Sequence, residues 1–335
     1  MRENIIELLA TANPENIELA FALAKSIKFN IKRHYNFAFW AKLGVNTDDF
    51  FNPRLVLVHH KLTTLPKQIR ALSHLRELYL TVNNLQDLNE ELLALLHLKR
   101  LHLRENQIAT ISLDMSLLPC LTHLELAQNK LTVLPDSLFK CPLLVELDFR
   151  KNKVESLPDT LGLLPKLEKL DASSNKLSKI PDTIGRLLQL KDLYLYENRL
   201  TALPDSIGKC TALTHLNIAL NQIGELPATL KNCVHLEHII AKENDISELP
   251  DIFADMRELR VLDFKYNRLK KLPDSVCEAT QLNILYLSNN KITHLPQNIG
   301  NLVNLRELFL QANPIDATEQ ARILAALPNC KVFFN

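Results

Sequence analysis

The sequence has almost no excess of charge of either sign. Its 335 residues include 39 lysines and arginines against 38 aspartates and glutamates, for a formal net charge of +1. Proteins that hold DNA, RNA or anionic lipid by general electrostatics usually show a basic excess. We therefore expect no nucleic-acid partner.

Long apolar runs are also missing. The opening stretch MRENIIELLATANPENIELA scatters acidic and amide residues among its apolar positions. It therefore lacks the basic region and uninterrupted apolar core of a secretory leader. No stretch approaches the roughly 18 apolar residues that cross a membrane. We expect neither a leader nor a membrane span in this sequence.

Cysteine pairs are absent as well. The six cysteines form no C-x-x-C pair and no terminal cluster, and no N-x-[ST] acceptor site accompanies them; they lie at positions 120, 141, 210, 233, 277 and 330. This usage is typical of a reducing compartment rather than of a disulfide framework. The prediction is a cytoplasmic protein whose cysteines serve as small core hydrophobes.

Catalytic motifs are missing too. The sequence contains no G-x-G-x-x-G, P-loop, G-x-S-x-G or H-E-x-x-H pattern. We expect no enzymatic activity and no cofactor. His215 and His238 share a repeat position and His235 is close in sequence, so a zinc site is geometrically conceivable, but a third and fourth ligand are not evident. A metal or small-ligand binding protein is therefore only a weak alternative.

What the sequence does have is an asparagine every 23 residues. The pattern around each is L-x-x-L-x-L-x-x-N-x-L, a leucine-rich repeat signature. A degenerate copy precedes the series, with Leu55, Leu57 and Leu62 in register and His60 in place of the asparagine. The eleven asparagines are Asn83, Asn106, Asn129, Asn152, Asn175, Asn198, Asn221, Asn244, Asn267, Asn290 and Asn313.

Each repeat predicts a strand followed by a turn. Alternating leucines indicate a strand with a buried face, and a Leu-Pro step, which holds nine of the 16 prolines, marks the extended segment that follows. The asparagine is predicted to bridge neighbouring coils, because buried turn backbone needs hydrogen-bond partners. Two repeats lack the Leu-Pro step, and residues 89–98 in the first of them read as a better helix than their counterparts.

The ends of the chain read as caps, since an open coil would expose its core. We predict a mostly helical N-terminal cap over 1–52, the solenoid over 53–315, and a closing helix and strand over 316–335. Residues 28–42 mix basic and aromatic residues and could contact a membrane or an acidic partner. The alternative is that their aromatic side chains seal the first repeat; these are Phe29, Tyr35, Phe37, Phe39 and Trp40.

Residues 63–315 resemble the 23-residue intracellular leucine-rich repeat class, whose second half reads L-P-x-x-[IL]-x-x-L. Ras-suppressor and Scribble-type proteins, plant intracellular Ras-group proteins and many bacterial repeat proteins carry it. The resemblance implies an α/β solenoid, curved, with a parallel sheet on its concave face and short helical or 3-10 turns on its convex face. It also implies a scaffold that often engages a protein through the concave face, and leaves the partner open.

Outward positions of the strands are the candidate partner-binding residues. One predicted group is an acidic docking strip for a basic segment, and its alternative explanation is a solvated ladder of salt bridges: Glu125, Asp148 and Asp171. A second group is apolar, with contacts to a cap as its alternative: Ile240, Val261, Ile284, Tyr286 and Phe309, with Tyr266 nearby. Tyr194 and Tyr196 also point outward.

Together these features predict a non-catalytic scaffold, monomeric, that binds a protein or peptide, with a role in intracellular signalling. A secreted or surface-attached adhesin or effector is the alternative from a different class.

Overall fold

The structure is a computed structural model that describes residues 2–10, 14–27, 30–45 and 51–334. The chain divides into two compact units, Met1–Asn152 and Lys153–Asn335. These units follow the density of contacts, whereas the predicted boundaries at 52/53 and 315/316 follow the repeat pattern and stay a prediction. Residues 46–50 of the predicted cap and its Phe29 lie outside the described residues.

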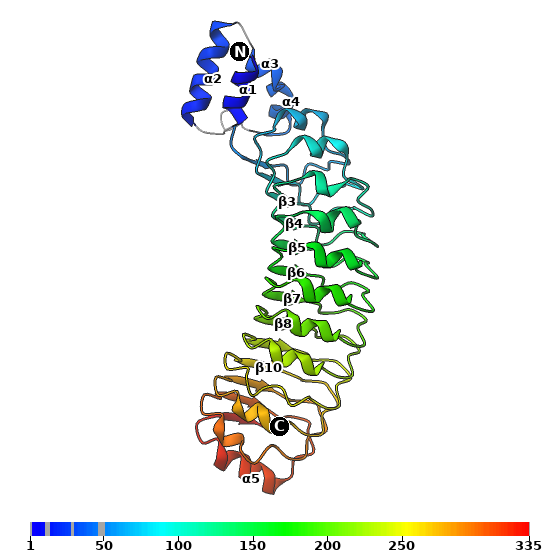
Figure 1. Cartoon of the computed structure of the whole chain (residues 1–335), viewed down its shortest axis with the longest axis vertical. Coiled ribbons are helices and arrows are strands. Elements are labelled where there is room, and N and C mark those ends of the chain that lie inside the picture. The colour runs from blue at the N-terminus through cyan, green and yellow to red at the C-terminus, as the bar shows by residue number, and fades with distance from the viewer. Residues whose placement is uncertain (1, 11–13, 28–29, 46–50, 335) are drawn as a thin grey trace. The chain divides into compact units, whose positions relative to one another are not determined.

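The first unit begins with short helices (Figure 1). Their buried side chains include Ile5 and Leu9 of the first helix and Ala20 and Ala24 of the second, which pack the two helices together. Spacing of four residues places each pair on one face of its helix. The helices are α1 (Arg2–Ala10), α2 (Pro14–Ser26), α3 (Ile31–His34) and α4 (Phe37–Lys42).

Aromatic side chains seal the first repeat. Tyr35 and Trp40 are almost fully buried, and Phe37 is buried as well. Phe51 lies at the centre: its ring is 5.3 Å from that of Tyr35 and 5.7 Å from His74 in the first repeat. Burial raises the pKa of Tyr35 to about 12. The predicted helical cap is therefore present, and these rings fill its junction with the repeats.

Strands of the first unit pair in parallel with a 23-residue register, so that Leu55 opposes Leu78 and Leu78 opposes Leu101. The middle residue of each strand is buried, as the alternating leucines predict. The strands are β1 (Arg54–Val56), β2 (Glu77–Tyr79), β3 (Arg100–His102), β4 (His123–Glu125) and β5 (Glu146–Asp148). The 3-10 turns are η1 (Lys67–Ala71), η2 (Glu90–Ala94), η3 (Met115–Leu117) and η4 (Asp136–Lys140).

The second unit repeats this arrangement with parallel strands in sequence order. The strands are β6 (Lys169–Asp171), β7 (Asp192–Tyr194), β8 (His215–Asn217), β9 (His238–Ile240), β10 (Val261–Asp263), β11 (Ile284–Tyr286), β12 (Glu307–Phe309) and β13 (Lys331–Phe333). The 3-10 turns are η5 (Asp159–Leu163), η6 (Asp182–Arg186), η7 (Asp205–Lys209), η8 (Ala228–Asn232), η9 (Asp274–Glu278) and η10 (Ile299–Asn301).

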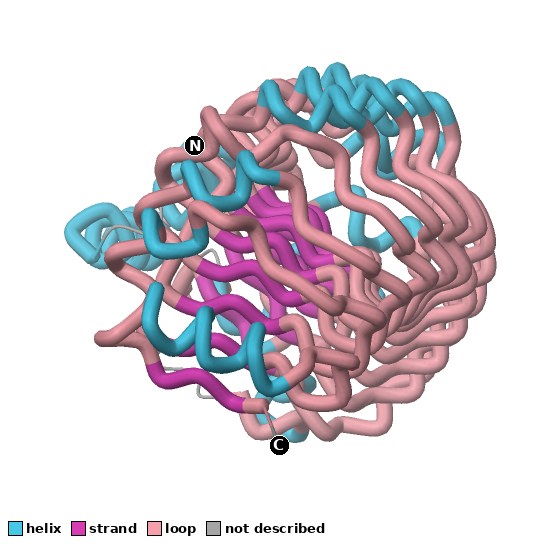
Figure 2. Tube along the Cα trace, turned by 90° about the horizontal axis from the view of Figure 1, so that it is seen from below, coloured by secondary structure: helices cyan, strands magenta, loops and turns pink. Residues whose placement is uncertain are grey.

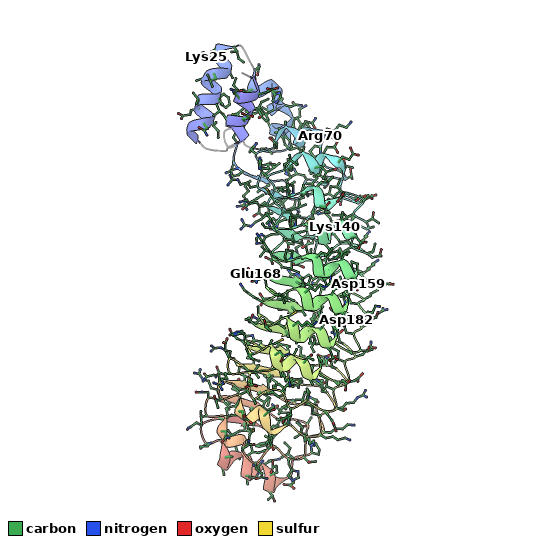
Figure 3. All side chains as sticks on the ribbon, in the orientation of Figure 1. Lys25, Arg70, Lys140, Asp159, Glu168 and Asp182 are labelled. Atoms are coloured by element: carbon green, nitrogen blue, oxygen red, sulfur yellow. The ribbon has the colours of Figure 1, made fainter. Side chains whose placement is uncertain are left out.

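Within the second unit, strands and 3-10 turns occupy opposite sides of the coils (Figure 2). Glu168, which precedes β6, lies on the strand side, whereas Asp159 and Asp182 begin turns on the other side (Figure 3). The predicted closing helix and last strand are present as α5 (Ala317–Ala326) and β13. Glu319 of α5 accepts the N–H of Leu295 at 2.8 Å, which ties the helix to the preceding coil.

The asparagines bridge neighbouring coils, as predicted. Asn198 Nδ2 donates to the carbonyl of Leu195 in its own coil and to that of Ala172 in the coil before, both at 3.0 Å. Its Oδ1 accepts the N–H of Leu177 at 2.9 Å. In the first unit Asn106 makes the same three contacts. This side chain therefore satisfies turn backbone that no strand partner reaches.

The residue before each asparagine is strained. From Val82 to Ala312, all eleven of these residues have φ between 51° and 58°, although none is glycine. Such a conformation costs a side-chain-bearing residue on the order of 1–2 kcal/mol. It aims the backbone N–H at the next coil: that of Glu197, for example, donates to the carbonyl of Ala219 at 2.9 Å.

Buried cysteines occupy leucine positions in the stack, as predicted. Cys141, Cys210 and Cys233 are fully buried, and the Cys210 thiol lies 3.3 Å from the carbonyl oxygen of Ile184. Burial raises the pKa of Cys210 to about 12 and that of Cys233 to about 11. A thiolate is therefore unfavourable at these positions, and they serve packing.

The first repeat without a Leu-Pro step does not form a better helix, so that prediction was wrong. The segment 89–98 contains η2, a five-residue 3-10 turn of the same length as η1. Stacking of η2 on η1 limits the width of the turn. Asn89 stands where other repeats have proline, and its side chain both accepts from the N–H of Leu65 and donates to the Leu65 carbonyl.

Candidate functional site on the sheet face

The sheet face of each unit consists of the outward side chains on its strands. They come from the first and third residues of each strand and from the residue two positions later. The middle strand residue is buried in every case among the first twelve strands. All the predicted partner-binding residues except Tyr266 belong to these outward positions.

In the first unit the third positions of β2 to β5 form a polar row, which comprises Tyr79, His102, Glu125 and Asp148. The His102 ring stacks on Tyr79 with centroids 4.2 Å apart, and its Nδ1 lies 2.8 Å from Glu125 Oε2. This hydrogen bond holds the pKa of Glu125 below its usual value, and the positive charge of Arg104 acts in the same direction. Glu125 is therefore already engaged within the protein.

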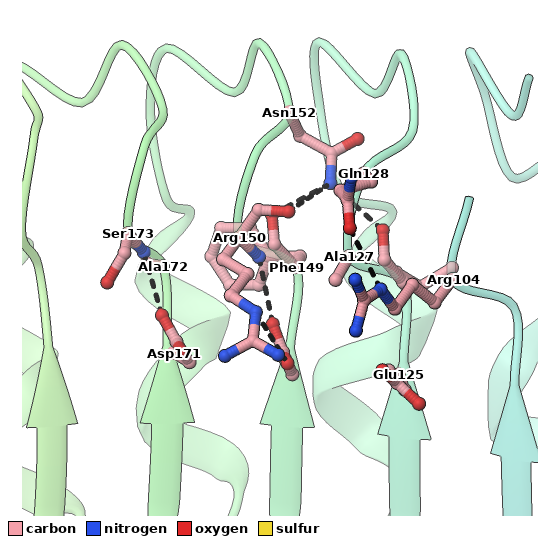
Figure 4. A network of polar contacts seen from close by, with 12 residues as sticks. Arg104, Glu125, Ala127, Gln128, Phe149, Arg150, Asn152, Asp171, Ala172 and Ser173 are labelled. Carbon is pink, nitrogen blue, oxygen red and sulfur yellow. Dashed lines mark hydrogen bonds and ion pairs between the residues drawn. The ribbon is translucent and has the colours of Figure 1, made fainter. Parts of the chain in front are cut away.

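Asp148 uses one carboxylate oxygen for local structure. Its Oδ1 accepts the N–H of Arg150 at 3.0 Å, while Arg150 Nε lies 3.4 Å from Oδ2 (Figure 4). Asp148 is buried, with 8% of the residue exposed. Glu125 and Asp148 oppose each other across β4 and β5, and each is stabilised by its own partner. This geometry favours the salt-bridge alternative over a strip held open for a basic ligand.

Asp171, in the second unit, has the same local role: its Oδ1 accepts the N–H of Ser173 at 3.0 Å. Asp263 does this for Lys265, and Asn217 for Ala219. A short acceptor side chain at the third strand position thus satisfies the N–H two residues later. The sequence signal for this role is an aspartate or asparagine at the third strand position, which charge alone does not reveal.

Tyr194 and Tyr196 lie half-buried on the outward side, as predicted. Tyr194 stands between Asp171 and Asn217 in the strand register. Burial raises the pKa of Tyr194, and the negative charge of Asp192 adds to the rise. The phenol therefore stays neutral and can serve as a contact side chain with a polar end.

The strongest feature of the second unit is an aromatic stack, defined as Tyr286, Phe309 and Phe333. Tyr286 and Phe309 have centroids 4.7 Å apart at an interplanar angle of 22°, and Phe309 and Phe333 are 4.5 Å apart at 5°. The Nζ atoms of Lys265 and Lys331 lie 4.3 Å from the Tyr286 centroid and 4.8 Å from that of Phe333. Three aromatic side chains of adjacent strands thus form one column.

Apolar side chains continue this surface. Ile240, Val261 and Ile284 are half-buried outward residues of β9, β10 and β11. Val261 opposes Ile284 directly across the strands. Tyr266 differs: it is 54% exposed and lies in the left-handed turn before Asn267, after the strand. The structure therefore places the other five predicted apolar residues on the strands β9 to β12 and Tyr266 on a turn.

Phe333 was missed by the sequence reasoning. It opposes Phe309 in the strand register, but the two residues are 24 positions apart rather than 23 because α5 interrupts the last coil. The one available signal was the CKVFF stretch that predicted β13. Register across a helix of different length could not be inferred from the period.

The two paired histidines do not complete a metal site. The His215 and His238 rings meet edge to face with centroids 4.7 Å apart, and His215 Nδ1 lies 2.9 Å from Asp192 Oδ1. His235 Nδ1 lies 2.9 Å from Glu258. Burial and the neighbouring His215 lower the pKa of His238. No group of three or more metal-ligating side chains occurs among the described residues.

A depression of about 690 Å³ lies in the first unit, in the coils that lack the Leu-Pro step. Asp87 shapes it by accepting the N–H of Ser112 at 3.1 Å and the hydroxyl of Ser112 at 2.6 Å. Thr63, Asn89 and Asp114 also line it. These polar groups largely serve the backbone around them.

Comparisons with known proteins agree with this geometry. Family descriptions match three parts of the chain: a leucine-rich repeat region over 227–332, a leucine rich repeat over 73–131 and 119–177, and a further leucine rich repeat over 209–225. The structure of a leucine-rich repeat protein of Leptospira interrogans is 31% identical, with 82% of each chain covered and a TM-score of 0.69. The chain belongs to the leucine-rich repeat family.

Two other structures are similar to this leucine-rich repeat protein. An internalin, InlF, of Listeria monocytogenes is 25% identical over 87% of this chain and 90% of its own, with a TM-score of 0.72. The repeat ectodomain of the Arabidopsis thaliana receptor kinase GASSHO1/SCHENGEN3, crystallised in complex with CASPARIAN STRIP INTEGRITY FACTOR 2, is 28% identical, with a TM-score of 0.71. It covers 84% of this chain, which spans 35% of that one. A search of curated sequences found no match.

Leucine-rich repeat proteins are typically non-enzymatic interaction modules. The fold of this member fits that description, since its outward side chains stand on open strands. None of the helices in the described part of the chain has the length and apolarity needed to cross a membrane. The narrower 23-residue intracellular class stays a prediction.

Proposed function

We propose that this leucine-rich repeat protein is a non-catalytic recognition scaffold that binds a protein or peptide on its sheet face. The aromatic stack of the second unit is the observation that carries the proposal. Its rings are only half-buried, and apolar side chains of β9 to β11 extend the same surface. Contiguous exposed apolar surface of this kind marks interaction sites.

The other predicted residues have secondary roles in this proposal. Tyr194 and Tyr196 supply amphipathic contacts, which interfaces favour. Three carboxylates already accept local hydrogen bonds, so only their remaining acceptor positions could contact a ligand; they belong to Glu125, Asp148 and Asp171. Binding therefore depends mainly on Ile240, Val261, Ile284, Tyr286, Phe309 and Phe333.

The absence of catalysis is part of the proposal. Open strands do little to exclude water, and catalytic carboxylates or histidines depend on desolvation or on a charged neighbour to shift their pKa. The receptor complex with CASPARIAN STRIP INTEGRITY FACTOR 2 is a related fold that holds a partner. It supports binding, and with it a signalling role, as the function proposed for this chain.

We propose a cytoplasmic location. In the described part of the chain all six cysteines are free thiols, four of them buried, as a reducing compartment allows. The alternative is a secreted or surface-attached protein, which the likeness to an internalin and to a receptor ectodomain favours. Cell fractionation of the native host with an antibody against this protein separates the two. Recovery in the culture medium or in the surface fraction would contradict the cytoplasmic proposal.

Affinity capture from the native host tests the binding face. We expect Tyr286→Ala combined with Phe309→Ala to reduce recovery of the partner at least tenfold, since loss of two central aromatic residues removes several kcal/mol in typical interfaces. Leu188→Ala combined with Val303→Ala is the matched control, because these residues are 58% and 75% exposed after η6 and η10. Equal recovery with both double variants, each with a native circular dichroism spectrum, would refute binding on this face.

A further inference from the structure

The rings of the aromatic stack present their edges rather than their faces. Interplanar angles of 22° and 5°, at centroid distances of 4.7 and 4.5 Å, mean that each ring covers the face of the next. Lys265 and Lys331 lie over the two end faces. Ring edges carry the positive part of the aromatic quadrupole. A partner therefore meets a surface that is apolar but electropositive.

Two cations with no salt bridge to a described residue flank this surface; the charge of one, Lys242, still acts on the Asp263 carboxylate. Lys242 lies two residues after β9, and Arg306 immediately precedes β12. Neither makes an ion pair with any described residue, whereas Arg260 pairs with Glu237 at 3.2 Å. Two positive charges at the margins of the stack thus remain available to a ligand.

Two of the negative charges in the same region, Asp263 and Glu237, already have ion-pair partners. Asp263 is buried, accepts the N–H of Lys265 at 3.1 Å, and lies 3.6 Å from Lys265 Nζ. Glu307 opposes Lys331 in the strand register but makes no ion pair with any described residue. A basic ligand would therefore find one unpaired carboxylate near the stack against two unpaired cations, so an acidic ligand would find the better charge complementarity.

We propose that the aromatic stack, with Lys242 and Arg306 at its margins, binds an extended acidic segment that carries an aromatic side chain. The acidic groups pair with the cations, and the aromatic face of the ligand meets the ring edges in a T-shaped contact. Four strand spacings from β9 to β13 cover about 19 Å, which an extended segment of about six residues spans. This inference rests on the proposed function and specifies the chemistry of its ligand.

Three labelled 12-residue peptides test it by fluorescence polarisation with the full chain. The first alternates glutamate and tryptophan among glycine and serine, the second replaces glutamate by lysine, and the third replaces tryptophan by alanine. We expect the first to bind, the other two to bind at least tenfold more weakly, and binding of the first to weaken as salt rises. Equal binding of all three, preferential binding of the basic peptide, or no binding of the first would overturn the inference.

Variants locate the binding. Lys242→Gln with Arg306→Gln should weaken binding of the acidic aromatic peptide at least fivefold, and Phe309→Ser should do so at least tenfold. Lys209→Gln with Lys231→Gln, at exposed positions in η7 and η8, is the charge-matched control. Phe309→Leu keeps the buried volume and separates loss of the ring from loss of folding. Unchanged affinity in the Lys242/Arg306 and Phe309 variants would also overturn the inference.

Failure of this inference and failure of the proposed function are distinguishable. If the native partner is lost with Tyr286→Ala and Phe309→Ala, while the acidic aromatic peptide never binds, the face is right and the ligand chemistry is wrong. If capture of the native partner is unaffected by that double variant, the proposed binding face itself fails.

Discussion

The sheet faces of the two units share a backbone but differ in chemistry. In the first unit the third positions of β2 to β5 form the polar row, where His102 contacts both Tyr79 and Glu125. In the second unit the equivalent positions on β11 to β13 form the aromatic stack. Both use strands in the same 23-residue register up to β12. The repeat thus determines where an outward side chain lies and leaves its chemistry open.

This difference separates a surface whose polar groups mostly have partners from one that hydrogen bonds cannot satisfy. Each member of the polar row has a hydrogen-bond partner within the protein, although Nε2 of His102 is buried without one. The stack leaves half-exposed ring edges that hydrogen bonds cannot serve, so covering them with a partner releases water. We regard the second unit as the better binding surface for this reason.

Removing a bridging asparagine should have the largest effect, and an equal one in both units. Asn106→Ala and Asn267→Ala each leave several buried backbone groups without partners. At about 1–3 kcal/mol for each unsatisfied buried group, we expect a loss of at least about 3 kcal/mol. Urea unfolding followed by circular dichroism measures it, with the exposed Gln107→Ala as control. A loss confined to one unit would contradict a shared scaffold.

The turn side should distinguish the units. A Cβ atom at Gly208 would overlap the Thr229 carbonyl oxygen, because the two atoms would be much closer than a carbon–oxygen contact allows. At Gly185 a Cβ atom would lie 2.5 Å from the Ser206 carbonyl oxygen. Phe139 occupies the corresponding position in η4 of the first unit. We expect Gly208→Ala to cost about 1–3 kcal/mol through overpacking. A urea midpoint no lower than that of Gly224→Ala, whose Cβ would meet nothing within 4 Å, would show that the turns can separate.

Much of the fold could be predicted because the same pattern of leucine and asparagine positions occurs eleven times in the sequence. The buried leucines, the bridging asparagines and the role of Cys210 follow from position in the period. The features that the 23-residue period could not predict depend on side-chain geometry within a coil. The hydrogen bond from the Ser173 N–H to Asp171 gives a predicted docking residue a structural role that its charge does not reveal. Phe333 belongs to the site because α5 shifts the register of β13 by one residue.

Coupling energies should separate the two faces by their response to salt. For Tyr286 and Phe309, a double-mutant cycle with alanine should give about 0.5–1.5 kcal/mol. It should change little between low and high salt, since no charge is involved. At acidic pH, where an imidazole carries a charge, the coupling of His102 with Glu125 should fall as salt rises, because a charged pair that is partly exposed is screened. Equal salt dependence of both cycles, measured from urea midpoints, would remove the proposed difference between the faces.

The smallest effect expected is a difference in pH response. Burial and His215 lower the pKa of His238 in the second unit, so the unfolded chain binds a proton more readily there, and stability falls as pH drops below about 6.5. The hydrogen bond from His102 lowers the pKa of Glu125 in the first unit, so its contribution is present above about 4.5 and is lost as pH falls further. Because each group is only partly buried, we expect less than about 1 kcal/mol from each. In the His238→Gln variant the urea midpoint should change less between pH 7 and 5.5 than it does in the unmodified protein. In Glu125→Gln it should change less between pH 5 and 3.5. If each variant instead affected the pH range expected of the other, both assignments would be contradicted.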